Sequence, residues 1–169
     1  MKHIINKLST AAFAGLCVFV FFGCPTNYPD LPLLGGGLIE IETGEIFNKD
    51  GTPRGWGGRG ASGGRCADNI NSVDSDQGYV VLKLPEDIEA KEYTVKFRYA
   101  TGEESFAVKF TVNNGDAIFT NKTEAGNGWD FAASHDLLAT TEKVPLKGGD
   151  ELKIQTSGYG AIDYLYLEP

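Results

Sequence analysis

The sequence predicts an all-β protein, a sandwich of two antiparallel sheets in a jelly-roll arrangement, preceded by a signal peptide. Apolar and polar residues alternate along several short segments, which is the period of a strand with one buried face. Glycine accounts for 22 of the 169 residues, and turn sequences separate the alternating segments. Long helical periods are missing from the sequence, so helical crossovers are not expected and the strands should pair antiparallel.

The first 23 residues have the pattern of a secretory signal peptide. A basic start containing Lys2 and Lys7 precedes the uncharged run 11–22, AAFAGLCVFVFF. This run is too short to span a bilayer as a stable helix, but it fits the apolar core of a signal peptide. We therefore expect residues 1–23 to be removed.

Cys24 follows the small residue Gly23 directly after this run. The arrangement resembles a bacterial lipobox, in which the cysteine receives lipid and becomes the new N-terminus. Several acyl chains on Cys24 would anchor the protein stably, whereas cleavage by an ordinary signal peptidase is the alternative. Residues 24–37 are rich in Pro and Gly and are predicted to be a tether. We expect a bacterial cell-envelope protein, at the outer membrane or cell surface, that meets the membrane only through its lipid.

Residues 38–169 form the predicted sandwich domain. The alternation is clearest in 93–99, where the odd positions are apolar, and in 105–112, where the even positions are apolar. Further strands are expected at 38–42, 79–84, 141–146, 151–156 and 161–167. Two long connections, 51–65 and 120–139, interrupt the pattern, and such connections often carry function.

The net charge of the chain narrows the class of molecule that it can bind. The formal net charge is −8 at pH 7, and the loss of Lys2 and Lys7 with the signal peptide makes it more negative. An acidic field repels polyanions, so no nucleic-acid partner is expected.

Cys66 is the only cysteine of the predicted domain, so we expect a buried, inert thiol. We expect the protein to be a monomer.

The sequence offers little for catalysis. Ser134, His135 and Asp136 include the three residue types of a triad, but neighbours in sequence cannot converge as triad side chains do. The other histidine, His3, falls in the signal peptide. We therefore expect a protein that is not an enzyme.

A series of short segments keeps a characteristic order over residues 38–169. The segments are Ile39–Glu42, Ala61–Arg65 followed by Asn69 and Ile70, Glu92–Ala100, Val112–Gly115, Gly128 with Trp129, Leu146–Ile154 and Ile162–Leu165. Together they resemble the carbohydrate-binding modules of families 6 and 35. The resemblance implies a galactose-binding-like β-sandwich that binds glycans without catalysis.

The resemblance also implies a structural calcium ion, held by Glu40 and Glu42 of the opening segment and Asp163 of the closing one. Calcium takes several hard oxygen ligands, and alternate positions on a strand point two carboxylates the same way. The alternative is that the glutamates are solvent-facing carboxylates at a sheet edge.

A saccharide site needs an exposed aromatic plate for the apolar face of the sugar and polar groups for its hydroxyls. Trp129 matches the binding-site tryptophan of these modules, and the alternative is a lid on the core. The candidate binding residues are Trp129, Tyr159, Asn127, Asp68 and Asn69. For Asp68 and Asn69 an ordinary polar turn is the alternative. Ala161 stands where the modules often have a ligand-binding Asn.

The sequence thus predicts non-catalytic binding of a polysaccharide or cell-wall glycan by a membrane-anchored lipoprotein. The alternative is a structural or adhesive lipoprotein whose sandwich binds a protein partner. An exposed Trp129 beside polar groups would favour the saccharide, and a buried Trp129 would favour the protein partner.

Overall fold

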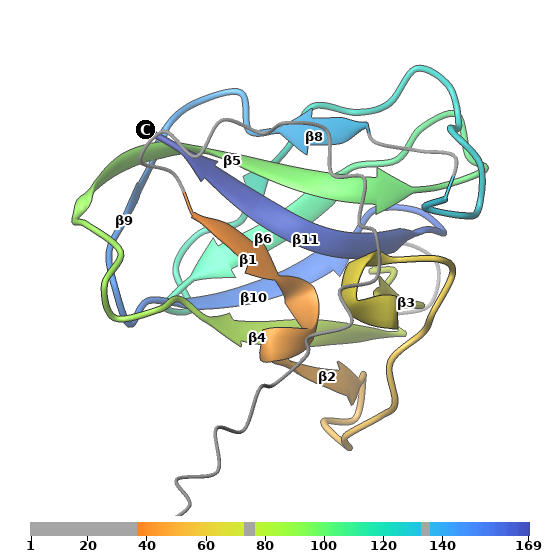
Figure 1. Ribbon diagram of the computed structural model, residues 1–169, viewed down its shortest axis with the longest axis horizontal. Helices are drawn as coiled ribbons and strands as arrows, with labels where there is room; N and C mark the ends of the chain where they lie inside the picture. Colours follow the sequence, from red (N-terminus) through yellow and green to blue (C-terminus); the bar gives the residue numbers. More distant parts are fainter. Residues whose placement is uncertain (1–36, 73–76, 133–135) are drawn as a thin grey trace, which may run out of the picture.

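The computed structural model describes residues 37–72, 77–132 and 136–169 (Figure 1). The predicted signal peptide, the lipidated Cys24 and the tether up to residue 36 lie outside the described residues, as do Ser134 and His135. A helix with the length and apolar character to cross a membrane is not found within the described ranges.

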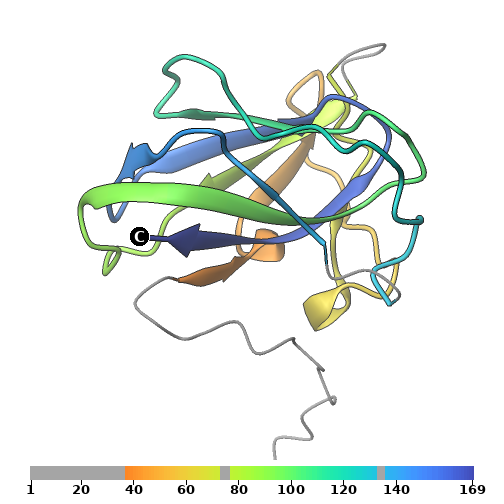
Figure 2. The same ribbon diagram turned by 90° about the horizontal axis from the view of Figure 1, so that it is seen from above.

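Two antiparallel sheets pack face to face, which confirms the predicted two-sheet all-β sandwich (Figures 1 and 2). The first sheet holds β1 (Leu38–Glu40), β11 (Ala161–Glu168), β5 (Lys91–Ala100) and β8 (Leu137–Ala139) in that order, while β3 (Ala67–Asp68) pairs with β11 and β9 (Val144–Leu146) pairs with β5. The second sheet holds β2 (Glu45–Asn48), β4 (Gly78–Lys83), β10 (Glu151–Thr156), β6 (Val108–Val112) and β7 (Ile118–Phe119) in that order. Two 3-10 turns, η1 (Ile41–Thr43) and η2 (Ser62–Gly64), complete the regular structure of the described residues.

The core lies between the two sheets and is built from the predicted alternation. The fully buried members include Val80 and Leu82 of β4, Val95 and Phe97 of β5, Phe110 of β6, and Leu152 and Ile154 of β10. Each such side chain contributes about 1.5–3 kcal/mol by leaving water. The apolar face predicted for residues 93–99 is therefore buried, and the strands predicted at 79–84 and 151–156 bury alternate residues.

The opening strand is shorter than predicted. We expected residues 38–42 to be extended, but β1 ends at Glu40 and residues 41–43 turn as η1. Ile41 is fully buried at this turn, so burial of its side chain accompanies the change of direction. Glu40 and Glu42 consequently do not alternate along one strand, and the expected reason for their shared orientation was wrong.

A second, smaller apolar cluster lies outside the main core. Cys66, Ala100, Phe131 and Ala161 are all fully buried there. Ala161 pairs with both Ala100 and Asp68, so the cluster covers the point where β5, β11 and β3 meet. Cys66 is a free, buried cysteine, as the sequence predicted, and burial raises the pKa of its thiol to about 12.

The two ends of the sandwich differ. At one end β5 finishes and β11 begins, and the long connections around residues 55–66 and 120–132 gather there, at the right in Figure 1. At the other end, Leu167 donates its backbone N–H to the carbonyl oxygen of Gly37, where the described chain starts. The long connections therefore lie far from the point at which the chain enters the domain.

Candidate functional site

The loop that carries Trp129 is attached to the end of β5. The backbone N–H of Thr101 donates to Asn127 Oδ1 at 2.9 Å, and Asn127 Nδ2 donates to the carbonyl of Tyr99 at 3.2 Å. The N–H of Gly128 donates to the carbonyl of Thr101 at 2.9 Å. Asn127 was predicted to bind sugar, and the structure places its amide in contacts that hold the loop.

Trp129 projects from this attachment and is 49% exposed. Its indole lies against Gly102, because a β-carbon at position 102 would stand 2.3 Å from Trp129 Cε2 and Nε1. Arg59 Nη1 donates to the carbonyl of Trp129 at 3.4 Å, and the Arg59 guanidinium lies 5.9 Å from the centre of the Trp129 ring. Trp129 is thus an exposed aromatic side chain beside a cation, not a lid on the core.

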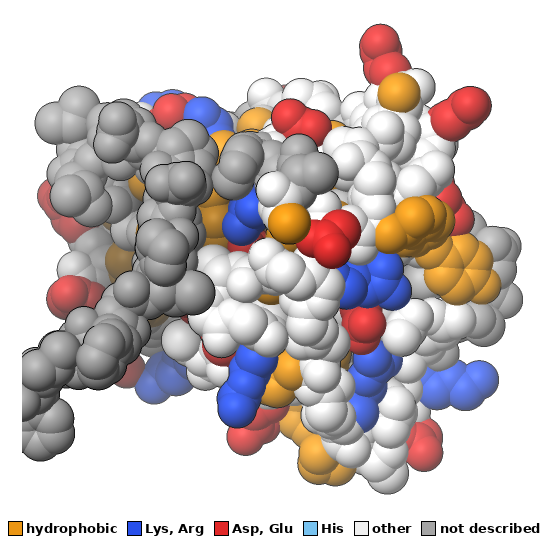
Figure 3. Space-filling view, turned by 45° about the vertical axis from the view of Figure 1, so that its right-hand side comes forward, with side chains coloured by type: hydrophobic (Ala, Val, Ile, Leu, Met, Phe, Trp, Pro, Cys, Tyr) orange, Lys and Arg blue, Asp and Glu red, His pale blue; other side chains and the backbone are white. Residues whose placement is uncertain are grey.

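Tyr159 is exposed at the same end, at 41%. Its N–H donates to Glu103 Oε2 at 2.9 Å, and its carbonyl accepts from Thr101 Oγ1 at 2.6 Å. Residues 101–103 therefore contact the loop of Trp129 on one side and the turn of Tyr159 on the other. In Figure 3, where this end is turned toward the viewer, apolar side chains reach the surface beside Lys or Arg side chains.

Asp68 and Asn69 lie at the end of β3 and are linked to Trp129 only indirectly. Asp68 accepts from Arg54 at 3.0 Å and is paired with Arg59 at 3.5 Å, so its carboxylate is neutralised by two cations. Asn69 is exposed with a φ of 50°, and its carbonyl accepts from Arg54 at 2.8 Å. Asp68 orients Arg59 beside Trp129.

Ala161, which replaces the asparagine often found in the resembled modules, is fully buried in the small cluster with Phe131. The Ala161 side chain therefore does not reach the exposed surface of the Trp129 loop. The exposed aromatic candidates at this end are Trp129 and Tyr159.

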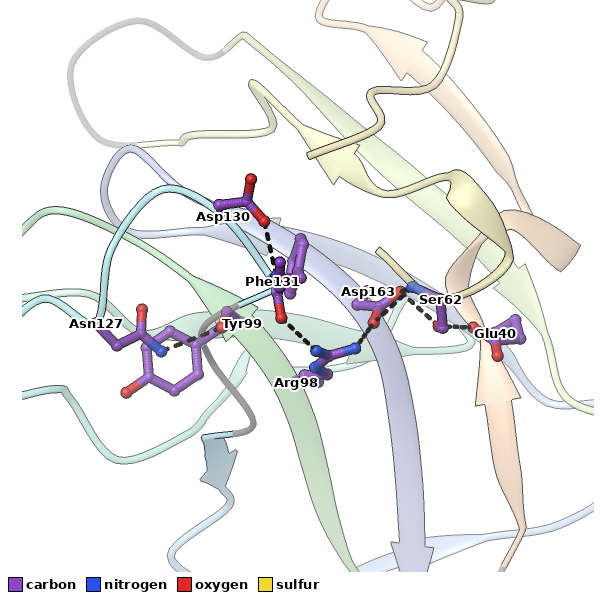
Figure 4. Close-up of polar contacts among 9 residues, drawn as sticks. Glu40, Ser62, Arg98, Tyr99, Asn127, Asp130, Phe131 and Asp163 are labelled. Atoms are coloured by element: carbon purple, nitrogen blue, oxygen red, sulfur yellow. Dashed lines mark hydrogen bonds and ion pairs between the residues drawn. The ribbon is translucent and has the colours of Figure 1, made fainter. Parts of the chain in front are cut away.

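Two of the three predicted calcium ligands, Glu40 and Asp163, contact Ser62 (Figure 4). The Ser62 hydroxyl lies 2.6 Å from Glu40 Oε2 and 2.7 Å from Asp163 Oδ1, and the Ser62 N–H donates to the Asp163 carboxylate at 3.0 Å. A serine hydroxyl has one proton, so it can donate to only one of the two carboxylates at a time. In the second of the two contacts, no hydroxyl proton is therefore available between the Ser62 oxygen and the carboxylate oxygen.

Glu42 adds a third carboxylate to this group. Its Oε2 is buried and has no hydrogen-bond partner, and Oε1 would stand 2.3 Å from a β-carbon at Gly63. Burial raises the pKa of Glu42 above its usual value, and the nearby carboxylates of Glu40 and Asp163 raise it further. Glu40, Glu42 and Asp163, called here the carboxylate cluster, thus bring three carboxylates close together and include one buried oxygen that has no hydrogen-bond partner.

In the part of the chain that the structure describes, no three His, Cys, Asp or Glu side chains already form a metal-binding group. The oxygens of Glu40 and Asp163 are turned to Ser62 and to Arg98. The ligand atoms nevertheless fit a hard cation, because the cluster offers carboxylate oxygens. One of these oxygens has no hydrogen-bond partner, and one short contact with the Ser62 hydroxyl has no proton between its two oxygens.

Arg98 joins the carboxylate cluster to the Trp129 loop and was missed by the sequence analysis. It is 5% exposed, forms an ion pair with Asp163 through Nη1, and donates from Nη2 to the carbonyl of Phe131 at 2.7 Å (Figure 4). Position 98 falls on the polar face of the alternating segment 93–99, which predicted a solvent-facing side chain. The buried partners Asp163 and Phe131 compensate the charge.

Ser62 also lies within Gly60–Gly64, a Gly-x-Ser-x-Gly spacing that the sequence analysis overlooked. In a hydrolase this spacing forms a strand–turn–helix elbow with histidine as the base. Here Ser62 begins a 3-10 turn, and its hydroxyl contacts carboxylates. These contacts give the hydroxyl a structural role in the cluster.

A pocket of about 470 Å³ lies away from these residues, at the end of the sandwich where β5 begins. Lys91, Val112 and Pro145 are among the residues that line it, and none of the candidate residues does.

No protein-family model and no curated protein matches the chain. Among solved structures, a family 35 carbohydrate-binding module from Clostridium thermocellum matches with a TM-score of 0.53 and 17% identity over 78% of this chain and 96% of the module. A family 35 module from Cellvibrio japonicus matches with a TM-score of 0.53 and 19% identity over 79% and 93%. An exo-β-1,3-galactanase from Phanerochaete chrysosporium, solved with galactose, matches with a TM-score of 0.54 and 20% identity over 78% of this chain, which spans 29% of the galactanase.

These likenesses show that the chain has the β-sandwich fold of family 35 carbohydrate-binding modules. The C-terminal family 6 module of a laminarinase from Zobellia galactanivorans has it as well, with a TM-score of 0.51 and 13% identity over 79% of this chain and 99% of the module. The resemblance predicted from the sequence is therefore confirmed at the level of the fold.

Proposed function

We propose that the protein binds a saccharide, without chemical change, at the end of the sandwich where Trp129 and Tyr159 are exposed. The observation that carries the proposal is the exposed Trp129 on a loop that Asn127 and Arg98 tie to β5. The hydrogen bonds of its loop keep the large apolar side chain of Trp129 exposed to solvent. An unattached loop could fold back and bury this side chain, so a fixed, exposed position indicates a ligand-binding surface.

The polar groups around Trp129 suit the hydroxyls of a sugar. Arg59 lies beside the ring, Glu103 lies next to Tyr159, and Asp130 is exposed on the same loop. A pyranose ring would stack its C–H face on the indole and direct its hydroxyls to these groups. The shared fold supports the proposal, since family 35 modules and a galactanase solved with galactose have it.

We propose further that the carboxylate cluster binds calcium as a structural ion. Calcium would be coordinated by carboxylate oxygens, including the unpartnered Oε2 of Glu42, with Glu40, Glu42 and Asp163 as its protein ligands. Its contribution would be to stability, because the cluster joins β1, η1, η2 and β11.

The predicted lipid on Cys24 completes the proposal. The chain enters the domain at Gly37, beside the end of β11, whereas Trp129 lies at the end where β11 begins. A lipid anchor before residue 37 would direct the Trp129 end away from the membrane, toward a polysaccharide or cell-wall glycan outside it.

A glycan array tests the binding proposal. Full chain in detergent is applied with calcium and with a chelator, alongside Trp129→Ala and the control Phe119→Ala, which truncates another exposed aromatic side chain. The galactose and β-1,3-galactan probes come first. Binding that Trp129→Ala abolishes and Phe119→Ala keeps would support the proposal, and binding unaffected by Trp129→Ala would refute it. A folded protein that binds no glycan would favour the alternative of a protein partner.

A further inference from the structure

We propose that Arg98 is the positioning residue of the saccharide site: it fixes the segment 127–131 on β5 and thereby holds Trp129 in its exposed orientation. This inference rests on the proposed function. It concerns a buried side chain that does not itself reach the ligand.

The segment around Trp129 is held at both of its ends by residues of β5 and by Thr101, which follows directly after it. On one side, Asn127 bonds to the backbone of Tyr99 and Thr101. On the other side, Arg98 bonds to the carbonyl of Phe131 at 2.7 Å. Trp129 lies between these two attachments, and the one at Phe131 is the side-chain bond that fixes the far end of the segment to β5.

The Phe131 attachment depends on a guanidinium in particular. Nη1 of Arg98 pairs with Asp163 of β11 while Nη2 reaches Phe131, so one planar group joins two elements. An ammonium is a compact charge on a flexible stem and lacks this rigid fork. The Arg98 guanidinium also lies 5.2 Å from the centre of the Phe131 ring and 5.8 Å from that of Tyr164, between two aromatic side chains.

Arg98 is in turn held by the carboxylate cluster. Asp163 is fully buried and accepts from the N–H and hydroxyl of Ser62 as well as from Arg98. The chain of contacts Glu40–Ser62–Asp163–Arg98–Phe131 therefore runs from β1 to the Trp129 loop (Figure 4). Through Arg98, the cluster that stabilises the sandwich also orients the exposed aromatic side chain.

The test uses the full chain in detergent, with Trp56→Phe as background, so that Trp129 is the only tryptophan. Arg98→Lys and Arg98→Met are compared with Val95→Ala, which truncates a buried core residue on the same strand. The side chain of Val95 forms no hydrogen bond to the loop. Acrylamide quenching reports the exposure of Trp129. Hydrogen exchange reports the Phe131 amide, which donates to the carbonyl of Arg59.

We expect both Arg98 variants to change the quenching of Trp129 and to speed exchange of the Phe131 amide by about 10-fold or more, because a hydrogen bond to a charged group is lost. Val95→Ala should lower the melting temperature without either change. The proposal is overturned if folded Arg98→Lys keeps the quenching and exchange of the parent, or if Val95→Ala alters both equally. If Arg98→Met does not fold, the same two measurements on Arg98→Lys and Arg98→Gln decide whether the positioning role holds.

No glycan enters this experiment, so its outcome is separate from that of the array. Glycan binding lost in Trp129→Ala, together with unchanged loop behaviour in Arg98→Lys, would overturn the positioning role alone. If quenching and exchange change in the Arg98 variants but no glycan on the array binds the parent, the positioning role would be supported and the saccharide would be refuted as the ligand.

Discussion

The indole of Trp129 lies directly on the α-carbon of Gly102. A β-carbon at position 102 would stand 2.3 Å from Trp129 Cε2 and Nε1 and 2.5 Å from Cζ2. Real contacts of this kind are never so short, so any other residue at position 102 must displace the indole. Gly102 is required for the observed position of the ring.

Gly102→Ala should therefore move Trp129 and weaken glycan binding by about 10-fold, a loss of about 1.4 kcal/mol of stacking. The emission maximum of Trp129, measured in the Trp56→Phe background, should shift, while the melting temperature changes little because Gly102 is exposed. The control is Gly55→Ala, where a β-carbon meets nothing within 4 Å. Unchanged emission and affinity in Gly102→Ala would contradict the packing described here.

Asp163→Asn tests the buried ion pair. The amide keeps the shape of the side chain but leaves the Arg98 guanidinium buried without its counter-charge. Breaking such a pair costs about 3–5 kcal/mol, so the urea midpoint should fall strongly. Glu168→Gln removes the partner of Lys96 in an exposed pair and should cost about 1 kcal/mol or less. Equal losses in the two variants would argue against a special role for Asp163.

The sandwich was predictable because strand burial has a period that the sequence displays. Residues 93–99 and 151–156 alternate in sequence, and the structure buries Val95 and Phe97 of the first and Leu152 and Ile154 of the second. The strands β3 and β7 have two residues each, too few for any period, and were not predicted. Alternation also failed on β11, where residues 161–167 are buried on both faces and Asp163 contacts Ser62 and Arg98.

The candidate site was predictable only in its exposed part. Trp129 and Tyr159 stand next to glycines, in stretches without strand alternation, and both are exposed. Arg98 escaped prediction because its partners, Asp163 and the Phe131 carbonyl, are distant in sequence and brought to it by the pairing of β5 with β11. A charged residue on a strand's polar face gives no sign in the sequence that a loop covers it.

Cys66 should resist alkylation in the folded protein. Burial raises the pKa of its thiol to about 12, so almost no thiolate is present at pH 8. Because the folded pKa is above the unfolded one, the thiol contributes stability that is fully present below pH 8 and is lost as pH rises toward 12. Mass spectrometry of the Cys66 peptide after iodoacetamide treatment should show modification in urea and almost none without it. Rapid modification of the folded chain would contradict the burial.

Glu42→Gln tests the calcium proposal most directly, because Glu42 Oε2 is buried without a partner and the substitution keeps the shape of the side chain. In the parent, calcium chloride should raise the melting temperature, with about 2.7 kcal/mol of stabilisation at a concentration 100 times the dissociation constant. In Glu42→Gln that increase should largely disappear, while without calcium the variant should be at least as stable as the parent, since burial and the neighbouring carboxylates, which raise the pKa of Glu42, disfavour its charged form. Glu45→Gln, an exposed carboxylate three residues further on, should respond to calcium like the parent. A parent that calcium does not stabilise would show that the cluster's charge is offset by Ser62 and Arg98 alone, and the ion would have no part in this fold.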